Sequence, residues 1–249
     1  TLLHAVGSES HRDLARQAVR ESLVLLRHDG ETLPLSPETA VLFVAGEAAD
    51  DIGLQAGGWS IEWQGRVGNI TPGSTILDGI EAAVSPRTQL NYNRFGNCNR
   101  FTDDEGQPLT ADVGIVVVGE RPYAEGIGDS NDLSLTEPEI NAIQRLRARS
   151  DKLVIILLSG RPLIITELLP QADAMIAAWL PGTEGAGVAD VLFGHYEFSG
   201  TLSYSWPRSM EQLPFDFANL PTDGCAAPLF PFGHGLTTRD SSTVLANCP

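Results

Sequence analysis

The sequence predicts an α/β fold, in which a largely parallel β-sheet is flanked by helices on both faces. Apolar runs of strand length alternate along the chain with segments of helical spacing. Two of these runs, residues 113–119 and 152–160, are apolar almost without interruption, as expected for strands buried on both faces. Strands and helices alternate in this way when helical crossovers connect parallel strands. With 249 residues and 42% apolar content, the chain can bury a sizeable core.

The expected elements follow in order from local patterns. Helices are predicted over residues 11–27, where apolar residues share one face, over 75–84, which starts at a Ser/Thr cap, over 136–149, which opens with a capping box and a proline, and over 184–194, which ends on glycine. Strands are predicted over residues 40–46, 113–119, 152–160 and 174–182. The last fifty residues are rich in proline, glycine and aromatics, and predict an irregular wrap with at most one hairpin.

Charge and hydropathy exclude several classes of partner. The chain has 32 acidic and 16 basic residues, a net charge of −16, and no basic stripe that could neutralise phosphates. We therefore expect no nucleic-acid partner and no binding to anionic membrane surfaces. No apolar run approaches the ~20 residues that a membrane-spanning helix needs.

Cysteine and histidine spacing predicts no metal site. Cys98, Cys225 and Cys248 lack the close pairs that zinc sites use, and the five histidines show no ligand spacing. A bridge between Cys225 and Cys248 would fasten the C-terminal tail and would suit a periplasmic or secreted protein, although it leaves the third thiol unexplained.

Two common kinds of site in α/β proteins are also absent. The loop after the first strand, GEAADDIGLQAGGWS, lacks the glycine spacing of a dinucleotide or phosphate loop, and Asp50 and Asp51 would repel a pyrophosphate. Leu158-Ser159-Gly160 does not form the nucleophile elbow of α/β hydrolases.

The strongest candidate for chemistry is Glu120. In VGIVVVGERPYAE, residues 113–125, a buried strand stops on this carboxylate, and ligands of parallel sheets sit where strands end. The alternative is that Glu120 only caps a loop or pairs with Arg121. Glu125 in the same segment is the rival candidate. Arg121 is expected to orient one of these acids, and Tyr123 to shield it from water.

Two tryptophans lie among glycines in GGWSIEWQG, residues 57–65. Glycines let a ligand approach the backbone closely, and an indole face can stack on the apolar face of a sugar ring. Trp59 follows two glycines, so we expect it to be a ligand platform. Trp63 has apolar neighbours in alternation, so we expect it to fill the core.

These segments resemble the second domain of family three glycoside hydrolases. The motifs GGWSIEWQG, VVVGERPYAEGIGD, LLSGRPLII, AAWLPGTEGAGVADVLFG and PLFPFGHGLTT occur in the order and spacing of that family, over roughly residues 10–238. They look closest to the branch of cereal and bacterial exo-β-glucanases. The leading HRDLARQAVRESLVLLRHDGETLPL is similar to the segment that joins the family's catalytic barrel to this domain.

The resemblance implies a six-stranded α/β sandwich and two-step retaining hydrolysis without a cofactor. In this mechanism a nucleophilic aspartate and a general acid/base lie ~5 Å apart. The nucleophile belongs to the barrel, which this chain lacks, so the chain alone is expected to be inactive. The motif match assigns the acid/base to Glu120, and substrate contacts to Trp59, Arg121 and Tyr123. The predicted substrate is a β-glucan or β-glucoside, and the predicted location is periplasmic or extracellular.

The expected organisation is an interdomain linker with its leading helix over residues 1–35, the sandwich domain over 36–238, and a C-terminal tail over 239–249. The alternative function is a non-catalytic module that binds carbohydrate or contacts another domain. A barrel encoded upstream would favour the enzyme, and a reading frame that starts near residue 1 would favour the module.

Overall fold

A six-stranded sheet with the order β1-β6-β5-β4-β2-β3 forms the centre of the molecule. The computed structural model describes residues 5–242. The strands are β1 (Val24–His28), β2 (Val41–Ala45), β3 (Gln89–Asn93), β4 (Ala111–Gly119), β5 (Ser150–Leu158) and β6 (Ala174–Trp179). All neighbouring strands run parallel except β1, which pairs with β6 in the antiparallel sense. The predicted α/β class, with its largely parallel sheet, is confirmed.

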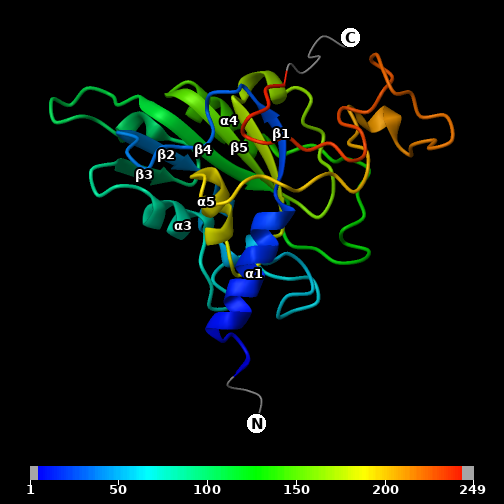
Figure 1. Ribbon diagram of the computed structural model, residues 1–249, viewed down its shortest axis with the longest axis horizontal. Coiled ribbons are helices and arrows are strands. Elements are labelled where there is room, and N and C mark those ends of the chain that lie inside the picture. The colour runs from blue at the N-terminus through cyan, green and yellow to red at the C-terminus, as the bar shows by residue number, and fades with distance from the viewer. Residues whose placement is uncertain (1–4, 243–249) are drawn as a thin grey trace.

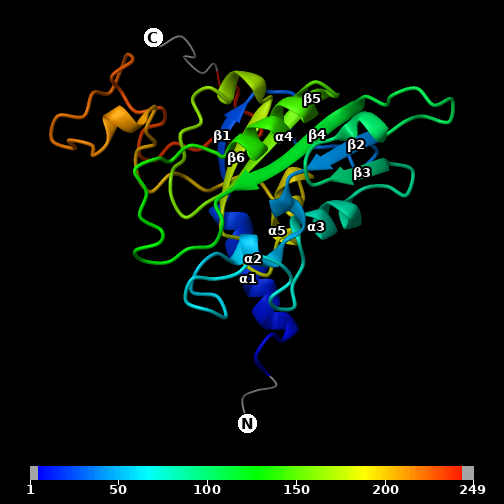
Figure 2. The same ribbon diagram turned by 180° about the vertical axis from the view of Figure 1, so that it is seen from behind.

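Helices cover the two faces of this sheet, as Figures 1 and 2 show from opposite sides. The helices are α1 (Glu9–Ser22), α2 (Ile52–Ala56), α3 (Ile76–Ala83), α4 (Glu137–Arg147) and α5 (Ala186–Leu192). Buried residues of α1, α2, α3 and α5 join one core cluster, and those of α4 join the cluster on the other face. Thr75 and Thr136 form capping boxes at α3 and α4, so both helices begin where the sequence predicts.

The structure differs from the prediction over residues 11–27. The helix ends at Ser22, and residues 24–28 form the edge strand β1. Val24 and Leu26 face one core cluster while Leu25 faces the other, which is the two-residue period of a strand. The apolar run VLL continues the helical spacing by chance, and pairing with β6 decides the local structure.

The second edge strand, β3, was not predicted. Three of its five residues, in the sequence QLNYN, are Gln or Asn, and only the last residue is buried, so it carries no continuous apolar run. It is held by five successive parallel pairs with β2. The sheet, not the local sequence, makes this segment a strand.

The region after α5 is irregular, as expected. Its regular features, as far as residue 242, are a short 3-10 helix at Met210–Gln212 and two isolated bridges, Trp206 with Phe230 and Leu236 with Leu25 of β1. Trp206 is fully buried and its indole donates to the Leu163 carbonyl, so this wrap covers the α4 face of the sheet. Among the described residues, no helix is long and apolar enough to cross a membrane.

Cys98 is a buried free thiol, and burial raises its pKa to about 11. Cys225 is disulfide-bonded. Cys248, the partner that the sequence predicts for it, lies outside the described residues.

Candidate active site at the carboxyl edge of the sheet

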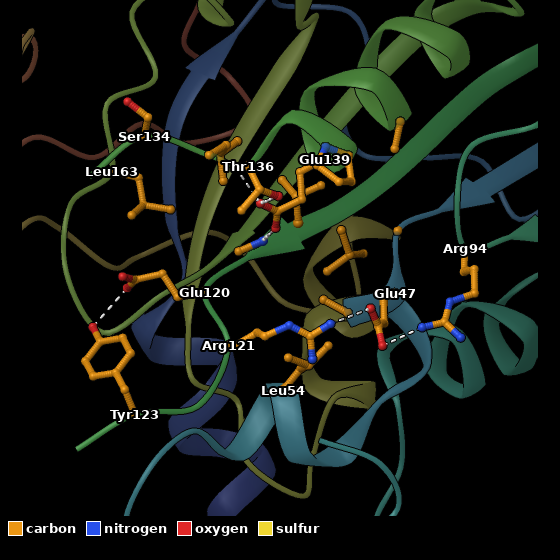
Figure 3. Close-up of a pocket in the computed structure, with 18 of the residues that line it drawn as sticks. Glu47, Leu54, Arg94, Glu120, Arg121, Tyr123, Ser134, Thr136, Glu139 and Leu163 are labelled. Carbon is orange, nitrogen blue, oxygen red and sulfur yellow. Dashed lines mark hydrogen bonds and ion pairs between the residues drawn. The ribbon is translucent and has the colours of Figure 1, made fainter. Parts of the chain in front are cut away.

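A crevice opens at the carboxyl ends of β2 and β4, where the crossover connections switch from one face of the sheet to the other. β2 and β4 are parallel neighbours, but α2 and α3, which follow β2, pack on one face, while α4, which follows β4, packs on the other. The loops leaving these two strands therefore diverge, and ligands bind at such switch points in open α/β sheets. The crevice measures about 630 Å³, and Glu120 lies in its lining. Figure 3 shows this region.

Backbone contacts with β5 and α4 fix the position of Glu120. Its N–H donates to the Leu158 carbonyl at 2.9 Å, which continues the pairing of β4 with β5. At Gly119 a Cβ atom would lie 1.8 Å from the same carbonyl oxygen, so only glycine allows this close approach. The Gly119 N–H in turn donates to the Glu139 carboxylate at 2.8 Å, which ties the end of β4 to the start of α4.

Both carboxylate oxygens of Glu120 accept hydrogen bonds. Arg161 donates its Nε and Nη2 protons to Oε1 at 2.8 and 2.6 Å, and the Tyr123 hydroxyl donates to Oε2 at 2.9 Å. The Glu120 side chain is 17% exposed and that of Arg161 is 27% exposed. The pair is thus mostly shielded, yet water and ligands still have access to it.

Two tyrosines form part of the surroundings of Glu120. Burial, and then the hydrogen bond to Glu120, raise the pKa of Tyr123 to about 12. Burial, and then the charge of Glu120, also raise the pKa of Tyr204. Both phenols therefore stay protonated at any ordinary pH, and Tyr123 remains a hydrogen-bond donor.

Glu125, the rival candidate, lies in a different environment. It accepts a hydrogen bond from the Trp63 indole at 2.8 Å, and this bond lowers the pKa of the Glu125 carboxyl. The carboxyl is fully exposed to solvent. The hydrogen bonds outweigh the small effect of burial, so the environment favours the ionised carboxylate, whereas a general acid at neutral pH must hold a proton.

The prediction that Trp63 fills the core is wrong. Trp63 is 56% exposed and Trp59 is 69% exposed, with ring centroids 6.3 Å apart. Residues 57–65 form a tight loop in which the Trp59 N–H donates to the Trp63 carbonyl, and Trp59 and Ile61 have positive φ angles. In such a loop the alternating apolar side chains cannot reach the core.

Trp59 is exposed, as a ligand platform must be, but it is not among the residues that line the crevice around Glu120. Its ring contacts are with Trp63, on the side of Glu125. The loop backbone nevertheless packs on the segment after Glu120, because a Cβ at Gly58 would lie 1.9 Å from the Tyr123 carbonyl oxygen. The two candidate features are therefore neighbours, joined through the backbone.

Arg121 does not orient either acid in this structure. Its guanidinium lies 3.4 Å from the Glu47 carboxylate, which also pairs with Arg94 at 2.5 Å. Figure 3 shows Arg121 and Glu120 on opposite sides of the chain, as adjacent residues in an extended segment are. These three charged side chains line the far part of the crevice.

Sequence reasoning missed Arg161, the residue that does hold Glu120. A signal was present, because Arg161 follows β5, the strand beside β4. The carboxyl ends of adjacent parallel strands meet at one edge of the sheet, so LLSGRP and VVVGER are brought together. Proximity in sequence favoured Arg121 instead.

Comparisons with known proteins agree with this architecture. The family description "Glycosyl hydrolase family 3 C-terminal domain" matches residues 23–238. A periplasmic beta-glucosidase of Salmonella typhimurium is 32% identical over an alignment that covers 97% of this chain and 37% of that protein. A lysosomal beta glucosidase of Dictyostelium discoideum is 31% identical, covering 99% and 32%.

Solved structures give the same result. A mutant of an exo-1,3/1,4-beta-glucanase from a Pseudoalteromonas species superposes with a TM-score of 0.81 and 36% sequence identity, covering 97% of this chain and 39% of that chain. A beta-glucosidase from Listeria innocua in complex with glucose superposes with a TM-score of 0.73 and 25% identity, covering 92% and 34%. The present chain spans about a third of the length of these relatives.

Proposed function

Because the chain belongs to the C-terminal domains of glycosyl hydrolase family 3, we propose that it is one part of a retaining, exo-acting β-glucosidase or β-glucan glucohydrolase. In this proposal the chain supplies the general acid/base, Glu120, and a barrel domain supplies the nucleophile. The position of Glu120 carries the proposal: it is a shielded carboxylate fixed at the end of β4, in the crevice at the switch point of the sheet.

The proposed reaction has two steps. In the first, the barrel nucleophile attacks the anomeric carbon while Glu120 gives a proton to the departing glycosidic oxygen. In the second, Glu120 takes a proton from water, and the resulting hydroxide displaces the enzyme carboxylate. Neither step requires a cofactor. Since the nucleophile comes from the barrel in this scheme, we expect the chain alone not to hydrolyse glycosides.

The two oxygens of Glu120 have different roles in this scheme. Two N–H groups of Arg161 hold Oε1. Oε2 accepts a hydrogen bond from the Tyr123 hydroxyl. When the carboxyl is protonated, this hydroxyl can rotate and accept a hydrogen bond instead. Oε2 is therefore the oxygen that carries the transferred proton in our proposal.

Substrate contacts and location follow from the same family membership. We propose that Trp59 stacks on the sugar of the leaving group, and that Arg121 and Tyr123 border the substrate. β-Glucans or β-glucosides are the proposed substrates, since relatives are named beta-glucosidases and an exo-1,3/1,4-beta-glucanase. A periplasmic or extracellular location is supported by the periplasmic relative and by the disulfide at Cys225.

The dependence of the rate on the leaving group tests the assignment. In the enzyme that joins this chain to its barrel, Glu120→Ala should lower kcat/KM for an aryl β-glucoside with a poor leaving group by about 10²–10⁴-fold. A dinitrophenyl glucoside, whose leaving group needs no proton, should lose far less in its glycosylation step. Glu125→Ala is the matched control and should stay near wild type with both substrates. Equal losses with both substrates, or losses confined to Glu125→Ala, would reject Glu120.

The exposed tryptophan pair favours one other function, a carbohydrate-binding module without catalysis. Trp59 and Trp63 present their rings to solvent on one loop. Titration of the isolated chain with β-glucan oligosaccharides, followed by tryptophan fluorescence, tests this function. Binding that Trp59→Ala abolishes, together with a wild-type rate for Glu120→Ala in the longer enzyme, would favour the module over the enzyme.

A further inference from the structure

We propose that Arg161 is a positioning residue that fixes Glu120 and the 123–128 loop in their working arrangement. The inference rests on the proposed role of Glu120 as the acid/base. Arg161 reaches the reacting atoms only through that carboxylate, so it is not itself a catalytic residue.

One guanidinium joins three parts of the site. Nε and Nη2 donate to Oε1 of Glu120, and Nη1 donates to the Gly128 carbonyl at 2.7 Å. The guanidinium carbon also lies 4.6 Å from the centroid of the Tyr123 ring, over its face. The planar fork of arginine can make these contacts together, whereas the point charge of lysine cannot.

Arg161 is itself held by its own segment. The Ser159 hydroxyl donates to the Arg161 carbonyl at 2.7 Å, and the Ile164 N–H donates to the Leu133 carbonyl at 2.9 Å. Leu163, two residues after Arg161, is 1% exposed. The segment that carries Arg161 is thus held on both sides of this residue, which limits how far the Arg161 guanidinium, and with it the Glu120 carboxylate, can move.

Glycine at position 160 completes this arrangement. A Cβ there would lie 3.1 Å from the Tyr123 hydroxyl, the group that donates to the second oxygen of Glu120. Gly160 therefore leaves room for the Tyr123 hydroxyl, which donates to one oxygen of Glu120, and Arg161 donates to the other oxygen. Since a misplacement of about 1 Å can cost 10²-fold in rate, this support matters for catalysis.

The dependence of the rate on the leaving group separates positioning from folding. If Arg161 holds Glu120 where it protonates the leaving group, loss of Arg161 should slow a substrate with a poor leaving group far more than a dinitrophenyl glucoside in its glycosylation step. A residue that only stabilises the fold would lower the amount of active enzyme and slow both substrates equally.

Arg161→Met in the full enzyme tests the inference, because methionine keeps an unbranched, flexible side chain but removes the charge and the donors. We expect kcat/KM for the poor leaving group to fall by about 10- to 100-fold, and the rate of glycosylation by a dinitrophenyl glucoside to fall far less. Arg161→Lys should recover only part of the rate, because lysine keeps the charge but not the paired donors.

Arg147→Met is the matched control. Arg147 is 30% exposed, pairs with Asp173 at 2.7 Å, and donates to the carbonyls of Ser150 and Asp151. Like Arg161 it binds a carboxylate and backbone carbonyls, but it is the last residue of α4 and lies just before β5. We expect its variant to keep the wild-type ratio of the rates with the two substrates. Identical effects of the two substitutions would show that Arg161 has only a structural role.

A double variant separates this inference from the proposed function. If Arg161 acts through Glu120, Arg161→Met should add little to the loss already caused by Glu120→Ala. If the two losses multiply, the inference is wrong even though Glu120 is the acid/base. If Glu120→Ala alone has no effect, the proposed function itself fails.

Discussion

At the residue scale, the candidate site depends on the few hydrogen bonds that hold the Glu120 carboxylate in place. Tyr123 and Arg161 occupy the two oxygens of Glu120 from two different loops. The position of Glu120 directly after a buried strand was predictable, because the apolar run that ends on this carboxylate is visible in the sequence. Its partners were not, because the arginine that binds it is 41 residues away while another arginine is adjacent. Only the order of strands in the sheet decides between Arg161 and Arg121.

Tyr123→Phe tests the donor to the second oxygen. The pKa of Tyr123, raised to about 12 by burial and by Glu120, keeps the hydroxyl protonated over the working pH range. Removal of the hydroxyl should lower kcat/KM for a poor leaving group by roughly 10-fold, the value of one hydrogen bond to a charged group. The melting temperature, measured in parallel, should change little. Tyr92→Phe is the control, because its hydroxyl donates to the Gly46 carbonyl instead. A loss equal to that of this control would contradict the role of Tyr123.

At the element scale, the central strands were predictable and the edges were not. Strands β4, β5 and β6 are buried on both faces, so their sequences are apolar throughout most of their length. Edge strand β1 continues the helical spacing of α1, and β3 is partly polar, so their structure depends on their pairing partners. The same reasoning failed for Trp63, where positive φ angles in the 57–65 loop override the alternation.

Asp29, just after β1, offers a pH test at this scale. Its carboxylate accepts from Lys152 of β5 at 2.7 Å and from the N–H groups of Glu31 and Thr32. Burial acts to raise the pKa of Asp29, but the hydrogen bonds from Lys152 and the backbone outweigh burial and hold that pKa well below its ordinary value. A depressed pKa contributes stability above the unfolded value of about 3.9, and this contribution is lost as pH falls further.

Asp29→Asn should therefore lower the free energy of unfolding by about 1 kcal/mol at pH 7, since it removes the charge that faces Lys152. The difference from wild type should shrink as pH falls below about 4, because the unfolded chain then takes up a proton at Asp29 while the folded chain still holds the carboxylate ionised. Denaturant unfolding of the isolated chain at pH 7 and at pH 3 gives both values. The exposed Asp104→Asn serves as control. A difference that is independent of pH would contradict this account of Asp29.

At the scale of the whole molecule, the proposed function needs a second domain at the carboxyl edge of the sheet. Helix α1 and the cyan loop around residue 60 lie at the same end of the molecule in Figures 1 and 2. Arg16 and Arg20 of α1 pair with Asp190 of α5, so this helix is fixed to the sandwich. The exposed side chain of Ile61 accompanies the two tryptophans on that loop. Exposed large apolar side chains that lie close together are typical of contacts with a partner or ligand.

Azide rescue of Glu120→Ala in the enzyme that joins this chain to its barrel is the most direct test of the central claim. Azide needs no general base, so it can replace water in the second step when the acid/base is missing. We predict that azide restores turnover of a dinitrophenyl β-glucoside, and that the product, identified by NMR, is the β-glucosyl azide. A variant that azide does not accelerate, and that still releases only glucose at the wild-type rate, would show that Glu120 is not the acid/base.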